Sequence, residues 1–403
     1  MLARVRKSLP DGVASLTLAG LIGAASSFLF WLVAARRAEI EVVGRATTVV
    51  LVGSAVNAVT SFGLTIGLLR AKSRSELGLS TVVSAMLLSL LGSVLFSAVV
   101  GGLWPSDSLI AHETSRLTLM VELVALSGGL ALSVLIDTLA SSYGVVRLPI
   151  VRNVVVLLAR LVAVFACHRL TVGSLVLIFM LPLVASVLLT FPWFMRGVSF
   201  PHGTRRGTIA AIRESLTAWP ASLVFSAVSM VLPLLVVLVV GPAKGAVFYL
   251  LWNIALLCNS LIGAVTSLGL GATDEPTIEM STRTSSRDRK TIVLVSIATA
   301  AGGVGATYVF GRHYVDLGLT AAPFVGLGFL PYGFMQYDVM RLRRDGRHGH
   351  AAIATSTVVL VMIMGLVVLR PQSLLVVSLI WCLASVIGTC VSRGRRNFSK
   401  PSA

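Results

Sequence analysis

Apolar runs of roughly 20 residues recur along the chain, and the charged residues gather in short clusters between them. A run of that length crosses the hydrocarbon core of a bilayer as one α-helix. Because the runs are continuous and do not alternate with polar residues, they predict helices and not the strands of a membrane barrel. We count twelve spans: 13–35, 46–69, 78–103, 115–140, 149–167, 171–194, 217–240, 245–271, 291–310, 317–339, 351–369 and 372–392.

The composition agrees with an all-α polytopic membrane protein. The chain is 56% hydrophobic and 12% charged, a balance that soluble domains do not have. Its net charge of +17 is attributed to the basic loops of a membrane protein, so no nucleic-acid partner is expected. The four cysteines lie in or beside apolar runs, so we expect small buried residues with no disulfide framework and no metal site.

The basic residues also predict an orientation. If the N-terminus is cytoplasmic, the inner segments hold 24 of the 33 Lys and Arg residues and the outer segments hold eight. Cytoplasmic loops are enriched in Lys and Arg, so this loop-by-loop alternation supports both the span count and the orientation. We therefore expect a multi-pass protein of the inner or plasma membrane with both termini in the cytoplasm.

A short sequence repeat suggests that the chain has two related halves. Residues 58–64 read AVTSFGL and residues 264–270 read AVTSLGL, an offset of 206 in 403 residues. The copies fall near the cytoplasmic ends of the second and eighth spans, which are equivalent positions in two sets of six. Two halves of six spans share one orientation, which is a recognised transporter layout.

The repeat predicts three segments. Residues 1–195 form an N-terminal six-helix bundle, 196–216 a basic cytoplasmic linker and 217–403 a C-terminal six-helix bundle. Within the linker, Thr208 to Leu216 is either a short basic amphipathic helix on the membrane surface or a solvated loop.

The first two spans resemble a known family. The run LAGLIGAASSFLFWLVAARRAEIEVVGRATTVVLVGSAVNAVTSFGLTIGLLR is similar to the N-terminal helix pair of Wzx-type lipid-linked oligosaccharide flippases, members of the multidrug/oligosaccharidyl-lipid/polysaccharide (MOP) exporter superfamily. The similarity includes a first helix ending in Ala-Arg, an outer turn at Gly44-Arg45 and a Gly-Leu-rich close at 62–64. The run VVGPAKGAVFYLLWNIALLCNSLIGAVTSLGL repeats the theme, with Gly241-Pro242 and Gly245 at its outer turn.

The resemblance implies two six-helix bundles around a central cavity and transport by alternating access. The implied substrate is a polyprenyl-diphosphate-linked oligosaccharide or related polysaccharide precursor, moved from the inner to the outer leaflet. The implied coupling ion is a proton or a sodium ion, and no cofactor is implied. The implied partners are membrane lipids and the polymerase and glycosyltransferase machinery of glycan synthesis.

Charged residues inside a membrane span are costly, so each one is a candidate for function. Glu122 in the fourth span and Arg160 in the fifth lie at similar depth in adjacent antiparallel spans, which predicts an ion pair. The pair has two interpretations: a static clamp between helices, or a cavity-facing cation for a diphosphate with Glu122 tuning it or taking a coupling proton.

Five further residues complete the candidate site: Asp137, Asn57, Asn253, Asn259 and Arg45. Asp137 lies near the cytoplasmic end of its span, within reach of Arg147 or Arg152. The three asparagines lie in the second and eighth spans, which are equivalent in the two halves, and either line the cavity or make interhelical hydrogen bonds. Arg45 lies at the outer mouth, either meeting the substrate or belonging to a neutralised surface turn.

Catalytic signatures are absent from the sequence: it has no GxxxxGK[ST] phosphate loop, HExxH, CxxC or GxSxG. We therefore expect a transporter and not an enzyme. Two alternatives remain open: a MOP-type drug or cation antiporter, which favours acidic groups in its cavity, and a membrane-embedded glycan polymerase, ligase or transferase, which normally needs a larger outer loop than 104–114.

Overall fold

The structure is a computed structural model of the whole chain, and every element in its described part is an α-helix. It describes the backbone of residues 2–73, 77–103, 115–198, 200, 204–271, 278–344 and 347–397. Side chains are not described for 1–15, 17, 73–76, 104–114, 199, 201–203, 205, 221, 225, 258–288, 343–346, 348 and 395–403.

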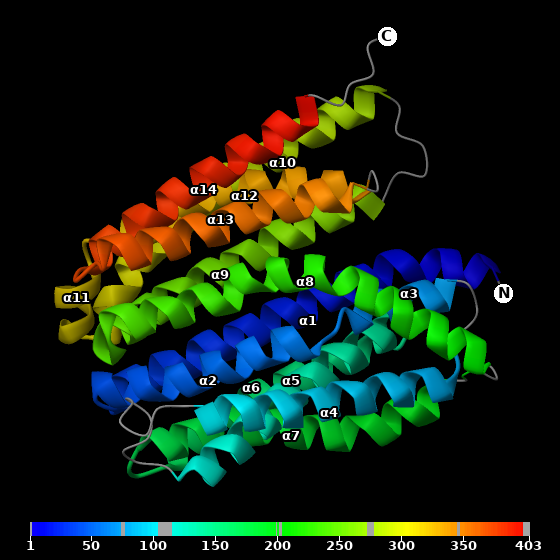
Figure 1. Ribbon diagram of the computed structural model, residues 1–403, viewed down its shortest axis with the longest axis horizontal. Helices are drawn as coiled ribbons and strands as arrows, with labels where there is room; N and C mark the ends of the chain where they lie inside the picture. The colour runs from blue at the N-terminus through cyan, green and yellow to red at the C-terminus, as the bar shows by residue number, and fades with distance from the viewer. Residues whose placement is uncertain are drawn as a thin grey trace. The chain divides into compact units, whose positions relative to one another are not determined.

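Seven helices make up the first part of the chain (Figure 1). They are α1 (Leu2–Arg37), α2 (Ile40–Thr60), α3 (Leu64–Ser73), α4 (Leu79–Leu103), α5 (Arg116–Ser142), α6 (Arg147–Ala166) and α7 (Val172–Gly197). Seven more follow: α8 (Arg205–Val240), α9 (Pro242–Gly271), α10 (Ile278–Phe310), α11 (Arg312–Gly318), α12 (Ala322–Arg344), α13 (His348–Leu369) and α14 (Leu374–Asn397).

Each predicted span corresponds to helical structure. Within the described residues, nine helices are long and apolar enough to cross a membrane, and the bent pair α11 and α12 brings the number to ten. Two shorter apolar helical stretches, Ser226–Val240 and Pro242–Leu257, match the seventh and eighth spans. The prediction of an all-α polytopic membrane protein is therefore confirmed.

The chain divides into two compact units, which are described separately. Unit 1 comprises Met1–Ala38 and Arg45–Ser226, and unit 2 comprises Glu39–Gly44 and Ala227–Ala403. In unit 1, α5 packs against α4 and α7, while α6 packs against α1 and α7. In unit 2, α12 packs against α9, α10, α13 and α14.

The two units repeat one pattern of neighbours. The third and fourth spans of each half pack together, as α4 with α5 and as α10 with α12. The fourth and sixth spans also pack together, as α5 with α7 and as α12 with α14. The fifth packs against the sixth in both halves, as α6 with α7 and as α13 with α14. This recurrence is the one expected if the halves arose by duplication.

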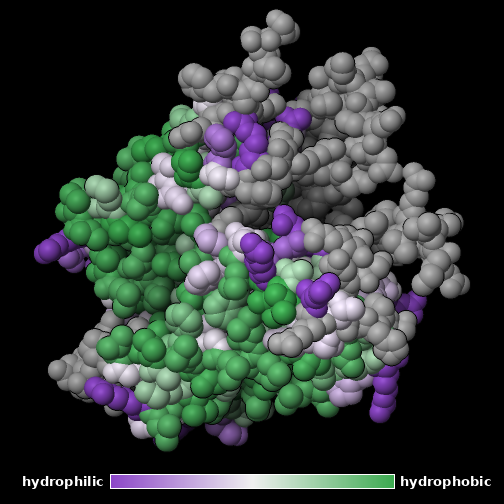
Figure 2. All heavy atoms as spheres, turned by 45° about the vertical axis from the view of Figure 1, so that its right-hand side comes forward, coloured by the Kyte–Doolittle hydropathy of each residue, from purple (hydrophilic) through white to green (hydrophobic). Residues whose placement is uncertain are grey.

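Large apolar side chains cover the outside of the bundles, as a lipid solvent requires. Leu91, Leu95, Leu188 and Leu189 are all more than 60% exposed. Apolar residues dominate the coloured surface in Figure 2. The interior is mostly apolar but also contains small polar residues, such as the buried Ser89, Ser93 and Ser97 of α4, as is common where membrane helices pack closely.

The second predicted span is a broken helix. α2 ends at Thr60 and α3 begins at Leu64, and the two residues just before α3 have positive φ angles, 46° at Phe62 and 65° at Gly63. A positive φ is ordinary for glycine and unfavourable for phenylalanine, so the break is locally strained. It falls inside AVTSFGL, whereas α9 continues unbroken through 264–270, the second copy of the repeat.

Helix α8 packs against the break between α2 and α3 and holds it in place. Residues 205–216, which the sequence analysis assigns to a linker, are helical and form the first part of α8. The indole nitrogen of Trp219 donates to the carbonyl of Val59 at 2.8 Å, and the ring of Trp219 lies 5.5 Å from that of Phe62. Of the two possibilities for this stretch, helix and loop, the structure shows the helix.

Candidate functional site

Arg160 is a buried cation within a membrane span of unit 1. It is 5% exposed on α6. Its Nε donates to the carbonyl of Phe179 at 2.9 Å, and its Nη1 donates to Ser26 Oγ at 3.2 Å. The guanidinium also lies 3.8 Å from the centre of the Phe179 ring. A carbonyl, a hydroxyl and an aromatic face therefore hold this charge between α1, α6 and α7.

The aromatic face belongs to a small cluster. Phe30 packs edge-on against Trp31 at 4.8 Å, and Trp31 stacks on Phe179 at 5.7 Å. All three are buried. Such contacts set the position of the rings that carry the arginine, so Arg160 sits in a preformed socket.

Glu122 is not the partner of Arg160. It is 6% exposed on α5, and among the described residues it makes no hydrogen bond or ion pair. The predicted Glu122–Arg160 ion pair is therefore wrong. Equal depth on neighbouring helices does not put two side chains on facing sides, and Arg160 is directed toward α1 and α7.

The charged pair that does form is Asp137 with Arg152, one of the two partners predicted for Asp137. Arg152 Nε donates to Asp137 Oδ1 at 3.1 Å, and a second, shorter contact joins Nη2 to Oδ2. Asn153 Nδ2 reaches the same carboxylate at 3.4 Å. Arg152 is only 1% exposed, and its Nη1 has no hydrogen-bonding partner among the described residues.

Arg152 is a buried charged residue that the sequence predicted only as a possible partner of Asp137 and not as a member of the candidate site. Arg152 lies near the start of the predicted span 149–167 and of α6, where an arginine side chain ordinarily extends to the solvated membrane interface. A signal exists in the sequence, because Asp137 and Arg152 stand on either side of a short helical hairpin. A two-pronged contact from a fully buried guanidinium neutralises the carboxylate and ties α5 to α6.

Asn57 lies at the end of α2, beside the break. It is 7% exposed, and its side-chain oxygen has no hydrogen-bonding partner among the described residues. One turn later, Thr60 contacts Ser93 Oγ at 3.3 Å, and Ser89 Oγ donates to the Thr60 carbonyl at 3.4 Å. These contacts form a polar seam between α2 and α4.

The remaining candidates are Asn253, Arg45 and Asn259. Asn253 of α9 is in unit 2, is 6% exposed and donates from Nδ2 to the carbonyl of Tyr249 at 2.8 Å. Arg45 is half-buried near the start of α2. The side chain of Asn259 lies outside the described residues. Among the side chains that the structure describes, Glu122, Asp137 and Arg160 do not contact one another.

Unit 2 carries a counterpart of the Asp137 pair. Asp338 lies near the end of α12, the helix equivalent to α5, and is 4% exposed. Arg393 of α14 approaches its Oδ2 at 3.8 Å, and the same guanidinium lies 5.4 Å from the Phe334 ring. Arg393 is exposed, so this pair is more weakly held than the buried pair of unit 1.

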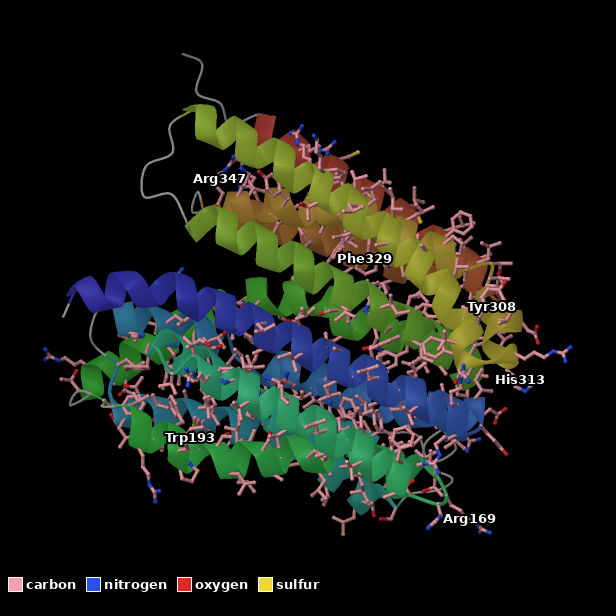
Figure 3. All side chains as sticks on the ribbon, turned by 180° about the vertical axis from the view of Figure 1, so that it is seen from behind. Arg169, Trp193, Tyr308, His313, Phe329 and Arg347 are labelled. Atoms are coloured by element: carbon pink, nitrogen blue, oxygen red, sulfur yellow. The ribbon has the colours of Figure 1, made fainter. Side chains whose placement is uncertain are left out.

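An aromatic core fixes the centre of unit 2. Trp252 of α9 meets Trp381 of α14 edge-on at 4.8 Å and Phe329 of α12 at 5.2 Å. Phe329, labelled in Figure 3, also contacts Tyr332 and Trp381. These rings join α9, α12 and α14 by aromatic packing.

Two glycines let α8 approach the broken second span. A Cβ at Gly63 would lie 2.5 Å from the carbonyl oxygen of Ser215. At Gly67 it would lie 1.9 Å from Ser215 Oγ and 2.5 Å from the carbonyl oxygen of Ala211. Backbone contacts this close leave no room for a side chain, so α3 and the first part of α8 form one packed body.

The whole chain has the fold of known transporters. An inward-facing multidrug resistance MATE family transporter of the MOP superfamily aligns over 100% of both chains, with a TM-score of 0.64 and 16% identity. A MATE in complex with MaL6 aligns over 97% of this chain and 96% of its own, with a TM-score of 0.64 and 14% identity. This chain has the MATE transporter fold.

A third solved structure shows that one fold accommodates different sites. A MOP superfamily transporter from Pyrococcus furiosus, described as having a binding pocket of reverse polarity, aligns over 97% of this chain and 96% of its own, with a TM-score of 0.60 and 14% identity. No protein-family model matches the sequence. No curated protein matches it.

On this MATE fold, unit 1 carries several charged groups inside its membrane spans. Within the part of the chain that the structure describes, no three His, Cys, Asp or Glu residues gather as a metal site would require. The buried charges are the cations Arg152 and Arg160 and the acid Glu122, which makes no hydrogen bond or ion pair among the described residues.

Proposed function

We propose that this chain is a membrane transporter that works by alternating access. Its fold matches MATE transporters from end to end, including one solved facing inward and one solved facing outward. Two units with the same neighbour pattern are the parts such a mechanism moves against each other. The single observation that carries the proposal is this fold likeness across the full chain.

For the substrate, we propose a polyprenyl-diphosphate-linked oligosaccharide or related glycan precursor. Buried cations support an anionic substrate: Arg152 and Arg160 are both almost fully buried in membrane spans. Asp137 is neutralised by Arg152, so it offers little attraction to a cation. Alternating access would expose Arg160 to the diphosphate, and loss of its contacts to Phe179 and Ser26 would accompany binding.

A drug or cation antiporter is the second candidate, and Glu122 favours it. A buried carboxyl group that makes no hydrogen bond or ion pair among the described residues is a natural site for a proton or an organic cation. Two of the solved structures with this fold are multidrug resistance transporters. Both candidates use a coupling ion, proton or sodium, and neither requires enzyme chemistry.

The proposed setting is the inner or plasma membrane with both termini in the cytoplasm. There the flippase would work beside the glycosyltransferases that build its substrate and the polymerase that consumes it. The lipid bilayer is then both the solvent of the spans and the source of the substrate.

A reconstitution experiment separates the two candidates. Purified protein in liposomes is given either a fluorescent polyprenyl-diphosphate disaccharide or the organic cation ethidium, and translocation is measured with and without proton and sodium gradients. We expect movement of the lipid-linked sugar, and Arg160→Met should slow it at least tenfold because a buried charge contact to phosphate is lost. The exposed Arg169→Met is the matched control and should leave the rate unchanged.

The competing outcome is equally distinct. Transport of ethidium but not of the lipid, abolished by Glu122→Gln and unaffected by Arg160→Met, would establish the antiporter. Unchanged lipid transport in both variants, at normal protein levels, would show that neither residue belongs to the transport site.

A further inference from the structure

The first part of α8 is too long to lie in the hydrocarbon core. The helix runs for 36 residues, from Arg205 to Val240. At 1.5 Å per residue this is roughly 54 Å, while the hydrocarbon core is about 30 Å thick. The predicted span 217–240 already fills that thickness. Residues 205–216 therefore extend into the headgroup layer at the end of unit 1 where α3 ends and α4 begins.

Exposed basic residues gather at this same end of unit 1, which we name the basic end. Arg70 of α3, Arg147 of α6 and Arg196 of α7 all lie there and are exposed. Lys72 packs its ammonium 4.3 Å from the centre of the Tyr143 ring, which joins the end of α3 to the end of α5.

The exposed residues of α7 mark the level of the membrane interface beside α8. Leu188 and Leu189 are 67% and 76% exposed, as lipid-facing residues are. Trp193, labelled in Figure 3, follows at 56% exposure, and the exposed Arg196 comes one turn later in the helix. Tryptophan is enriched at the boundary between acyl chains and headgroups. The start of α8 is separated from Arg196 by only a short connection, so it begins at the headgroup level.

One face of this segment is fully used by unit 1. Ala211 and Ser215 are buried against α3, where Gly63 and Gly67 make room for them. Thr208 Oγ1 contacts Thr81 Oγ1 at 2.9 Å, which ties the segment to the start of α4. The segment is therefore fixed in rotation, and its other face is directed away from these contacts.

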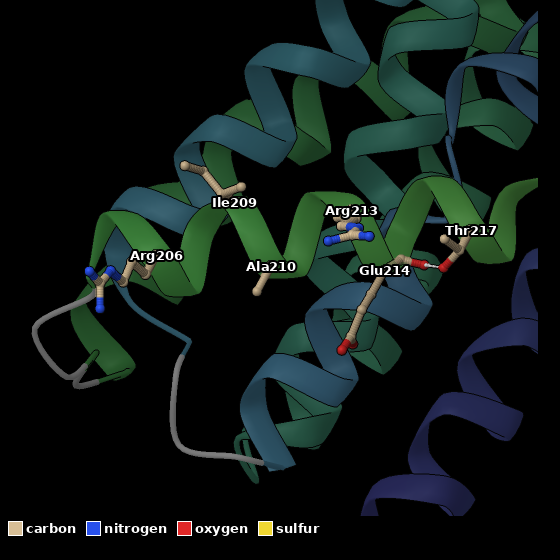
Figure 4. A pocket seen from close by; sticks show the side chains of 6 residues that line it. All are labelled: Arg206, Ile209, Ala210, Arg213, Glu214 and Thr217. Carbon is tan, nitrogen blue, oxygen red and sulfur yellow. Dashed lines mark hydrogen bonds between the residues drawn. The ribbon is translucent and has the colours of Figure 1, made fainter.

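The other face is both basic and apolar. A shallow cavity of about 470 Å³ lies along it. Figure 4 shows the side chains that line this cavity: Arg206, Ile209, Ala210, Arg213, Glu214 and Thr217. Ile209 is 57% exposed and Leu216 is 45% exposed. Arg206 and Arg213 are exposed cations on the same face, about two helical turns apart. Two arginines against one glutamate leave the lining positive.

We propose that this face binds the headgroups of anionic glycerophospholipids in the leaflet at the basic end. Arginines at this depth meet lipid phosphates, and the apolar side chains between them enter the boundary of the acyl chains. Water would solvate the arginines but not Ile209 and Leu216, and the hydrocarbon core would solvate Ile209 and Leu216 but not the arginines. The headgroup layer suits both kinds of side chain. The site is separate from the transported substrate, so it stands or falls independently of the proposed transport activity.

The binding of short-chain lipids to the purified protein in detergent tests the proposal. The titrants are dioctanoyl phosphatidylglycerol and dioctanoyl phosphatidylcholine. We expect the protein to bind phosphatidylglycerol in preference, and Arg206→Gln with Arg213→Gln to weaken that binding on the order of tenfold. Arg169→Gln with Arg312→Gln removes two exposed charges elsewhere and should change nothing. Arg206→Lys with Arg213→Lys should keep the preference, because it keeps both charges.

Three results would overturn the proposal. They are equal binding of the two lipids, an equal loss in the Arg169 and Arg312 control, and full competition by millimolar inorganic phosphate, which would indicate a simple anion site without a lipid requirement. Melting temperatures in lipid-free detergent show whether each variant is folded. If the double glutamine variant does not fold, the double lysine variant still tests the proposal, because it must keep the preference for phosphatidylglycerol.

Discussion

Replacing Gly67 by valine is expected to cause the largest loss of stability of any single substitution in unit 1. A Cβ there would overlap Ser215 Oγ at 1.9 Å and the Ala211 carbonyl oxygen at 2.5 Å. The second contact is to backbone, so no side-chain rotation relieves it, and α8 must leave α3. We expect a cost of about 3 kcal/mol or more, seen as a lower melting temperature and loss of folded protein.

Two companion variants make the Gly67 result specific. Gly20→Val adds the same group where no atom lies within 4 Å of the new Cβ, and should melt close to the parent protein. Gly67→Ala combined with Ser215→Ala removes the hydroxyl but leaves the Ala211 carbonyl in the way, so it should recover only part of the loss. A Gly67→Val protein as stable as Gly20→Val would show that α3 and α8 do not pack as described.

Replacing Arg152 by methionine is expected to cause the second large effect. The change leaves Asp137 buried without its two-pronged partner, and removing one member of a buried ion pair costs about 3 kcal/mol or more. Thermal unfolding of the purified protein in detergent measures the loss. Arg196→Met, at an exposed position on α7, should stay within about 0.5 kcal/mol of the parent protein.

A double-mutant cycle tests whether the loss belongs to the pair. Asp137→Leu combined with Arg152→Met removes both charges, and the double variant should be more stable than the sum of the two single losses predicts. Additive losses would mean that the two side chains act independently, contrary to their contact in the structure.

The sequence predicted helices better than it predicted their faces. Span length and hydropathy depend on composition alone, so all the spans have helical counterparts. The pairing of Asp137 with Arg152 was also within reach, because a short hairpin brings the start of α6 back beside the end of α5. Glu122 and Arg160 have no such constraint: equal depth says nothing about rotation about the helix axis.

The breaks within spans could not be predicted from the composition of the apolar runs. Span 46–69 is apolar throughout, yet it splits at Phe62 and Gly63, whose positive φ angles depend on contacts with Trp219 and Ser215 far along the chain. Span 317–339 likewise begins inside α11, and α11 and α12 meet at a 58° bend. Tertiary packing decides such features, and a run of apolar residues reads the same with or without them.

The most direct test of the central proposal measures distances between spin labels on the two units. One labelled pair replaces Arg169 and Arg312, and a second replaces Arg196 and Lys290, all exposed positions, in a protein whose native cysteines are changed to alanine. Alternating access predicts that one distance lengthens while the other shortens when substrate or the coupling ion is added in nanodiscs. Two distances that stay constant, or that change in the same direction, would contradict it.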